Sequence, residues 1–296
     1  MLLAACGGTS NGVAPSLVTG IAPAKKQVKP AKQVKHPYLF VANANGYSEL
    51  WSVGEYKSPY TGNPKLTISK GLDQPQGLAF FKRDLFVANY ANSTVTEYAK
   101  PYTGAPIATI SNSVDGPEQI AFHNSDLFVA NYANSTVTEY AKPYTGAPIA
   151  TISNSVQGPF GVALDASGDL FVANLTNTTV TEYAPPYTRS PIATISNSVT
   201  NPVALALDAS GDLFVATSNS NTVLEYAPPY TSGPIATITD GMQRPDGLAF
   251  DASGNLWVAM NANSTVLEYA PPFTGAPIAS ISNGLNYPTE LTFALK

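Results

Sequence analysis

The sequence contains one cysteine and two histidines in 296 residues, and only 12% of its residues are charged. A single cysteine excludes a disulfide framework and a cysteine-based zinc site. Two histidines leave no basis for a histidine-rich metal site or a proton relay. No apolar run reaches the roughly 18 residues that a membrane-spanning helix requires. These shortages exclude several classes of site before any motif is considered.

Proline, glycine and tyrosine are plentiful, with 25, 22 and 16 residues, whereas methionine occurs only three times. Hydrophobic residues make up 44% of the chain, which is enough to bury a sizeable core. This composition favours many short strands joined by tight turns over long helices.

Charge is unevenly distributed along the chain. Residues 1–36 carry five lysines and no acidic residue, and residues 37–296 hold 10 basic and 20 acidic residues. A phosphate-binding surface requires clustered lysine and arginine, which the main domain lacks. We therefore expect no nucleic acid partner, and we interpret the lysine-rich stretch as an extended linker. Its lysines are Lys25, Lys26, Lys29, Lys32 and Lys35.

The first residues resemble a targeting signal. Leu3-Ala4-Ala5-Cys6 resembles a bacterial lipobox, at which a lipoprotein precursor is cleaved and lipidated on the cysteine. We expect residues 1–6 to be a truncated lipoprotein signal, residues 7–36 a Lys/Pro-rich tether and residues 37–296 the folded domain. The resemblance implies a bacterial cell-envelope protein, on the periplasmic or extracellular side, that contacts the membrane only through a lipid on Cys6.

The remainder of the chain consists of six copies of one repeat. A Leu-Phe-Val-Ala anchor recurs every 42 to 46 residues, with tryptophan in place of phenylalanine in the last copy. Segments 84–114 and 126–156 are identical over 31 residues. The six anchors begin at Leu39, Leu85, Leu127, Leu170, Leu213 and Leu256.

A complete unit is visible in the last repeat. Its expected strands are 244–250, 256–259, 265–270 and 277–281, separated by segments rich in Gly, Pro and Asn. A tight turn is expected at 251–255, where Gly254 is able to adopt a positive φ. Four strands in about 40–45 residues indicate a β-propeller blade, so six units predict a six-bladed propeller.

The ends of the domain indicate how the ring closes. The domain begins at a second strand, 38–41, and ends at a sixth first strand, 288–293. We expect the C-terminal strand to join the N-terminal blade, which leaves no broken edge in the ring. The expected fold is all-β: a six-bladed propeller with four antiparallel strands per blade.

Three stretches of the sixth repeat carry a family resemblance. Pro-Asp-Gly-Leu-Ala-Phe-Asp at 245–251, Gly-Asn-Leu-Trp-Val-Ala at 254–259 and Asn-Ser-Thr-Val-Leu-Glu-Tyr at 263–269 resemble the NHL repeat. NHL-like propellers include scaffolds, receptor and RNA-binding modules, lyases and lactonases, so the resemblance implies a fold without deciding a function. The family's Val-Ala-Asp is Val-Ala-Asn here, at Asn43, Asn89, Asn131 and Asn174. The family's arginine before the third strand is threonine, at Thr94, Thr136, Thr179, Thr222 and Thr265.

Candidate ligand-binding residues follow from the position of the repeat proline. Propeller ligands usually lie around the central channel near the start of the innermost strands, and the residue after each proline is the natural channel position. This residue differs in all six repeats while the scaffold around it is repeated. The channel positions are Gln76, Glu118, Phe160, Val203, Asp246 and Thr289, and Glu290 follows in place of the usual glycine.

One of these positions resembles a metal ligand. Pro245-Asp246-Gly247 is similar to the Pro-Asp-Gly of gluconolactonase-like propellers, whose aspartate binds a divalent metal. The resemblance implies that Asp246 and Glu118, three blades apart on opposite walls, bind Ca²⁺ or a similar hard ion that activates water. Against this, that family also uses asparagine ligands, and no channel position here is asparagine. The alternative is that both are solvated acids at the channel mouth.

Two further patterns have structural interpretations. Asp165-Ala166-Ser167-Gly168-Asp169 resembles the opening of a calcium loop, but its spacing favours a β-turn. Tyrosine recurs near the end of each third strand, and we expect it to pack between blades. These tyrosines are Tyr98, Tyr140, Tyr183, Tyr226 and Tyr269.

Three functions therefore remain open. The first is a non-enzymatic, monomeric binding module on an envelope lipoprotein, with a protein or small-molecule ligand; few titratable groups favour it. The second is a divalent-metal-dependent lactonase or esterase-type hydrolase that uses Asp246, Glu118 and Glu290. The third is a lyase of the virginiamycin type, for which none of the six channel positions supplies a histidine.

Overall fold

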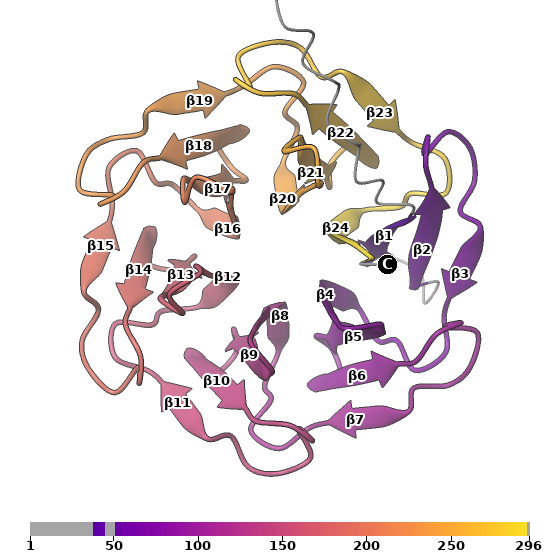
Figure 1. Ribbon diagram of the computed structural model, residues 1–296, viewed down its shortest axis with the longest axis horizontal. Coiled ribbons are helices and arrows are strands. Elements are labelled where there is room, and N and C mark those ends of the chain that lie inside the picture. The colour runs from indigo at the N-terminus through magenta and orange to yellow at the C-terminus, as the bar shows by residue number, and fades with distance from the viewer. Residues whose placement is uncertain (1–37, 45–50, 295–296) are drawn as a thin grey trace, which may run out of the picture. The chain divides into compact units, whose positions relative to one another are not determined.

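The computed structural model describes residues 38–44 and 51–294. The expected lipidation residue Cys6 and the tether at 7–36 lie outside these residues. The described part of the chain contains 24 strands and no helix, so it holds no helix long and apolar enough to cross a membrane. The strands form six four-stranded antiparallel sheets around a central axis (Figure 1). This confirms the six-bladed propeller predicted from the repeats.

Each blade has four layers from the axis outward. The innermost strands are β24 (Pro288–Phe293), β4 (Pro75–Phe81), β8 (Pro117–His123), β12 (Pro159–Leu164), β16 (Pro202–Leu207) and β20 (Pro245–Phe250). The second strands are β1 (Tyr38–Asn43), β5 (Asp84–Asn89), β9 (Asp126–Asn131), β13 (Leu170–Asn174), β17 (Leu213–Thr217) and β21 (Leu256–Met260). The third strands are β2 (Ser52–Lys57), β6 (Thr94–Tyr98), β10 (Thr136–Tyr140), β14 (Thr179–Tyr183), β18 (Thr222–Tyr226) and β22 (Thr265–Tyr269). The outer strands are β3 (Leu66–Ile68), β7 (Ala108–Ile110), β11 (Ala150–Ile152), β15 (Ala193–Ile195), β19 (Ala236–Ile238) and β23 (Ala279–Ile281).

The first blade is assembled from both ends of the described chain. Its strand order is β24-β1-β2-β3, and β24 pairs with β1 in the register Leu39↔Phe293 and Val41↔Leu291. We number this sheet blade 1 and the sheets that begin with β4, β8, β12, β16 and β20 blades 2 to 6. The expected closure by the C-terminal strand is confirmed.

The outer strands are shorter than the sequence suggested. The strand expected over 277–281 begins two residues later, at Ala279. Proline at 277 has no N–H to donate, and the Ile278 amide bonds to the Glu268 carbonyl (2.7 Å) before the paired register begins. The turn expected at 251–255 is confirmed, because Gly254 has a φ of 81°.

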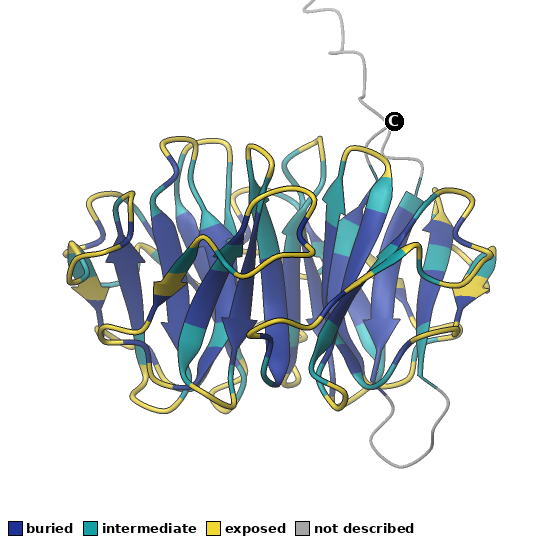
Figure 2. Cartoon of the chain, turned by 90° about the horizontal axis from the view of Figure 1, so that it is seen from below, coloured by how far each residue is buried: buried dark blue, intermediate teal, exposed yellow. Residues whose placement is uncertain are grey.

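The second strands form the most deeply buried layer of each blade. Their Leu-Phe-Val-Ala anchors are 0–1% exposed, and the side view shows burial concentrated on the strands with exposure on the loops (Figure 2). Both faces of each sheet are covered by neighbouring blades, which explains the continuous apolar runs in place of strict alternation. The repeated anchor residues therefore form the buried scaffold of each blade. The residues that differ between repeats lie at the start of the inner strands.

The repeated tyrosines fasten each blade to the one before it. Tyr183 is 1% exposed, and its hydroxyl donates to the Asn154 carbonyl in the preceding blade (2.6 Å). Tyr56 makes the same bond across the closure, to the Asn283 carbonyl (3.0 Å). The remaining acceptors are the carbonyls of Lys70, Asn112, Asn197 and Asp240. The expected blade-to-blade role is confirmed.

The Val-Ala-Asn asparagines hold a neutral hydrogen-bond network. Asn89 is fully buried, and its carbonyl oxygen accepts from the Asp73 amide (3.1 Å). Its Nδ2 donates to Thr96 Oγ1 (2.9 Å) and lies 3.4 Å from Thr94 Oγ1. Amide and hydroxyl groups thus occupy the positions at which the NHL resemblance would place an aspartate and an arginine. This substitution is consistent with the low charge of the chain.

Candidate functional site

The seven predicted channel residues lie together on the axis. They line one narrow cavity of about 10 Å³, and Gln119 is an eighth lining residue. The cavity lies where a bulge interrupts the pairing of the inner strands, between Pro75 and Leu78 in blade 2 and at the equivalent places in the others. A bulge turns successive side chains toward one side, so that blades 1 and 3 each bring two residues to the axis and the other blades bring one. The cavity residues are Gln76, Glu118, Gln119, Phe160, Val203, Asp246, Thr289 and Glu290.

A hydrogen bond across the axis closes this cavity. Gln119 Nε2 on β8 donates to Glu290 Oε2 on β24, two blades away. The opposite end of the glutamine amide, Oε1, accepts from the Val162 amide on β12 (2.8 Å). Glu290 Oε1 accepts from the Leu291 amide (2.9 Å). One side-chain bridge thus links blades 1, 3 and 4 through the centre of the ring.

Glycines on the other inner strands make room for this bridge. A Cβ at Gly161 would lie 3.1 Å from Gln119 Oε1, and a Cβ at Gly247 would lie 2.9 Å from Glu290 Oε1. The repeat glycine is therefore retained where the bridge passes and replaced where the bridge originates. Gln119 was missed by the sequence analysis, although its replacement of the repeat glycine was a readable signal.

Three carboxyl groups face this enclosed space. Burial raises the pKa of Glu290 to about 8, and the Gln119 and Leu291 hydrogen bonds oppose that rise. Burial raises the pKa of Asp246 to about 7, with Arg244 opposing. Burial and the charge of Asp246 raise the pKa of Glu118, whose buried Oε2 has no hydrogen-bond partner among the residues that the structure describes. The axis therefore favours neutral carboxyl groups.

A wider pocket opens above this closure. Its volume is about 480 Å³, and it lies on the face where the inner strands begin. Among the described residues that line it, Arg244 and Asp246 alone are charged, and Arg244 lowers the pKa of Asp246. Its hydrogen-bonding side chains are Gln76, Asn201, Ser218, Asn219, Asn261, Tyr287 and Thr289. We call this cavity the axial pocket.

The axial carboxyl groups do not fit a divalent metal ion. The described residues include no group of three or more His, Cys, Asp or Glu side chains that could hold one. Ca²⁺ takes roughly 6–8 oxygen ligands, and the carboxyl of Glu290 already accepts bonds from Gln119 and Leu291. Glu118 and Asp246 stand on β8 and β20, three blades apart, as expected from the sequence. The pair offers too few donors for the metal role that the gluconolactonase resemblance implied.

Comparisons with known proteins agree with the geometry of the fold. Residues 229–296 match the sequence model described as "SMP-30/Gluconolactonase/LRE-like region". This match covers the C-terminal quarter of the chain. The matched region contains Pro245-Asp246-Gly247. It also contains Thr289 and Glu290, the two residues of β24 that line the closed cavity. No curated protein matches the chain by sequence.

Solved structures share the propeller at low sequence identity. A protein of unknown function from Bacteroides caccae has a TM-score of 0.69 at 12% identity, over 86% of this chain and 98% of that one. A chain of a nidogen/laminin complex has a TM-score of 0.68 at 15% identity, over 87% and 98% of the two chains. Virginiamycin B lyase from Staphylococcus aureus has a TM-score of 0.57 at 11% identity, over 73% of each chain. At these identities the likeness shows the fold alone.

Proposed function

We propose that the propeller is a non-enzymatic binding module whose axial pocket takes a neutral ligand rich in hydroxyl and amide groups. The observation that carries this proposal is the lining of the axial pocket. Seven side chains with neutral hydrogen-bonding groups surround it, and its two charges are of opposite sign. Pockets of about 300–1,000 Å³ with a few convergent polar groups are typical of small-molecule sites.

The floor of the pocket supports binding in preference to chemistry. The Gln119–Glu290 bridge occupies the axis, and the neighbouring carboxyl groups have raised pKa values, which disfavour a carboxylate nucleophile. The one described histidine, His123, ends strand β8 and does not line the axial pocket. The site offers a rigid surface of donors and acceptors at its mouth.

A calorimetric titration tests this proposal. Di-N-acetylchitobiose carries both hydroxyl and amide groups, and we expect it to bind the EDTA-treated full chain at one site. Asn201 lines the pocket, and its Oδ1 accepts from Asn219 Nδ2 (2.8 Å), so Asn201→Ala should weaken binding about tenfold. Asn112→Ala, an exposed change outside the pocket, serves as the control. Equal affinity in both variants, or no heat with this and related neutral saccharides, would contradict the proposal.

We also propose that the propeller is carried on a bacterial envelope lipoprotein. The support is the Leu3-Ala4-Ala5-Cys6 lipobox resemblance followed by a lysine- and proline-containing stretch free of acidic residues. A Cys6→Ser protein should move from the membrane fraction to the soluble fraction. Unchanged partitioning would refute the lipid anchor without affecting the proposed pocket.

A metal-dependent lactonase-type hydrolase is the second candidate. The gluconolactonase-like match at residues 229–296 favours it, because that region contains Asp246 at the rim of the axial pocket. This function predicts turnover of sugar lactones that requires a divalent metal and is lost in Asp246→Asn. Lactone hydrolysis with those two properties would replace the binding proposal.

A further inference from the structure

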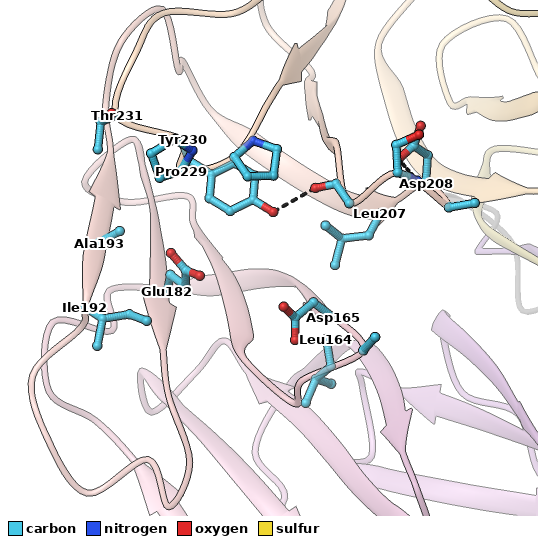
Figure 3. Close-up of a pocket in the computed structure, with 15 residues that line it drawn as sticks. Leu164, Asp165, Glu182, Ile192, Ala193, Leu207, Asp208, Pro229, Tyr230 and Thr231 are labelled. Carbon is cyan, nitrogen blue, oxygen red and sulfur yellow. Dashed lines mark hydrogen bonds between the residues drawn. The ribbon is translucent and has the colours of Figure 1, made fainter.

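A second pocket lies between blades 4 and 5, on the face where the inner strands end (Figure 3). Its volume is about 780 Å³, and we call it the 4/5 groove. Asp165, Glu182 and Asp208 line it, and its lining contains no lysine, arginine or histidine. The groove is separate from the axial pocket, with which it shares no lining residue.

Glu182 is the unusual residue in the groove. The residue is 9% exposed, and its carboxylate faces the groove, whose lining offers no cationic partner. Burial, followed by the charges of Asp169 and Asp165, raises its pKa to about 7. Figure 3 shows its carboxylate on the same side of the groove as that of Asp165, with Leu207 and Tyr230 across from them. A largely buried glutamate whose carboxylate faces a groove lined by no cationic side chain indicates a position that a cation from outside can fill.

The chain supplies such a cation in an equivalent groove. Glu97 in blade 2 has the same register as Glu182, since each pairs with the phenylalanine of its second strand. Lys142 of blade 3 lowers the pKa of Glu97, and its Nζ lies 5.6 Å from the Phe81 ring centroid. Lys100 has the same effect on Glu55 one blade earlier. In blade 5 the residue at the lysine position is Pro228.

Two further replacements leave the 4/5 groove open. Phe122 stacks on Phe81 in the groove between blades 2 and 3 (ring centroids 5.1 Å apart), whereas Leu207 and Asp165 occupy these positions in the 4/5 groove. In the groove between blades 3 and 4, His123 occupies the equivalent of the Asp165 position. There, a Cβ on Gly168 would lie 3.0 Å from the imidazole. At the equivalent Gly211 the nearest atom to such a Cβ, from Pro228, is 3.9 Å away.

We propose that the 4/5 groove binds a primary alkylammonium group from outside the chain, in the place that Lys142 occupies two grooves away along the ring. The ammonium would meet the Glu182 and Asp165 carboxylates. An aliphatic stem of lysine length would lie against Leu164, Leu207 and Tyr230, as lysine stems lie on apolar surface. A free aliphatic amine and an accessible lysine side chain both carry this group.

Isoleucine methyl NMR of the full chain distinguishes this groove from the others. Ile192 lines the 4/5 groove, and Ile107 is its equivalent in blade 2, with similar exposure of 59% and 61%. At pH 8.5, butylammonium should shift the Ile192 δ1 methyl along a saturable curve and leave Ile107 unmoved. Butanol, the neutral analogue, should shift neither methyl. Comparison with Nα-acetyl-lysine methylamide shows whether a lysine side chain binds more tightly than a free amine.

Three variants make the result specific. Glu182→Gln should weaken butylammonium binding at least about tenfold, because it removes the charge-assisted contact. Pro228→Lys places in blade 5 the lysine that the chain already carries at positions 100 and 142, so it should abolish binding. Glu225 is the equivalent glutamate in the groove between blades 5 and 6, where Phe250 stands in place of Leu207. Glu225→Gln should change the butylammonium affinity measured at Ile192 by less than about twofold. Equal shifts at Ile192 and Ile107, equal effects of butanol, or full affinity in Glu182→Gln would overturn the proposal.

Discussion

Individual carboxyl groups give this propeller a predictable response to pH. Glu290 has a folded-state pKa of about 8, well above the 4.5 of an exposed glutamate, because it is buried at the axis. Between these values the folded state retains a proton that the unfolded state has released. The stabilisation is therefore complete below about pH 4.5 and is lost as the pH rises through about 8.

We expect the free energy of unfolding to fall as the pH rises from 5 to 8, and to fall less steeply in Glu290→Gln. Each pKa unit between the folded and unfolded states is worth about 1.4 kcal/mol, so the total fall between pH 5 and 8 should differ between the two proteins by a few kcal/mol. Urea denaturation at several pH values measures this. Asp240→Asn, at an exposed carboxylate, is the control. A Glu290→Gln protein with the slope of the unmodified chain would contradict the assignment.

The tyrosine hydroxyls act at the same scale. Tyr183→Phe removes the bond to the Asn154 carbonyl and leaves that partly buried acceptor unpaired, which should cost about 1–2 kcal/mol. Tyr132→Phe, which removes a partly exposed hydroxyl, should change stability by less than about 0.5 kcal/mol. Chemical denaturation of both variants measures the difference, and equal costs would show that the inter-blade bond adds no stability.

Among the elements, the inner strands approach one another most closely where the repeat has glycine. A Cβ at Gly77 on β4 would lie 2.3 Å from the Glu118 carbonyl oxygen on β8. This neighbour is backbone, so relief requires a shift of a whole strand. Gly104, by contrast, has nothing within 4 Å of the equivalent Cβ.

Gly77→Ala should therefore destabilise the propeller by about 2–3 kcal/mol, as overpacking does elsewhere. Gly104→Ala should change stability by less than about 0.5 kcal/mol. Thermal unfolding of the two variants provides the comparison. A Gly77→Ala protein as stable as Gly104→Ala would show that the strands are not held at the spacing described here.

Sequence reasoning recovered the elements and the tyrosine packing between blades, and it missed two other contacts between blades. The Leu-Phe-Val-Ala anchors fixed the number of blades, and the proline positions identified seven of the eight residues that line the closed cavity. Gln119 was missed because the sequence pattern pointed only to the residue after each proline. The bulge in β8 brings both Glu118 and Gln119 to the axis. The relation of Glu182 to Pro228 was missed because it depends on which third strand faces which neighbouring turn, a cross-blade register that a single repeat does not reveal.

For the whole molecule, closure of the ring depends on β24. This strand completes blade 1, and its Glu290 accepts the hydrogen bond of the axial bridge. Its Leu291 is buried in one cluster with Leu39, Tyr56 and Trp257. Without it, β1 would be left with an unpaired edge and the flank of β20 would be uncovered.

Removal of residues 288–296 should therefore abolish the single cooperative unfolding transition and cause association through the exposed edge. Removal of residues 295–296 alone is the control. Size-exclusion chromatography combined with urea denaturation follows both effects. A monomeric, cooperatively unfolding truncation would mean that five complete blades are sufficient.

At the axis, the Gln119–Glu290 bridge closes the ring, and we predict that the carboxyl groups there bind no divalent metal ion. The most direct measurement is thermal unfolding of the full chain with and without excess Ca²⁺, Mn²⁺ or Zn²⁺. A site saturated at about 100 times its Kd would add roughly 2.7 kcal/mol and raise the Tm by several degrees. We predict an unchanged Tm in each case. A rise of about 5 °C that disappears in Asp246→Asn would contradict this prediction and show that the axis binds a metal ion, as the hydrolase candidate requires.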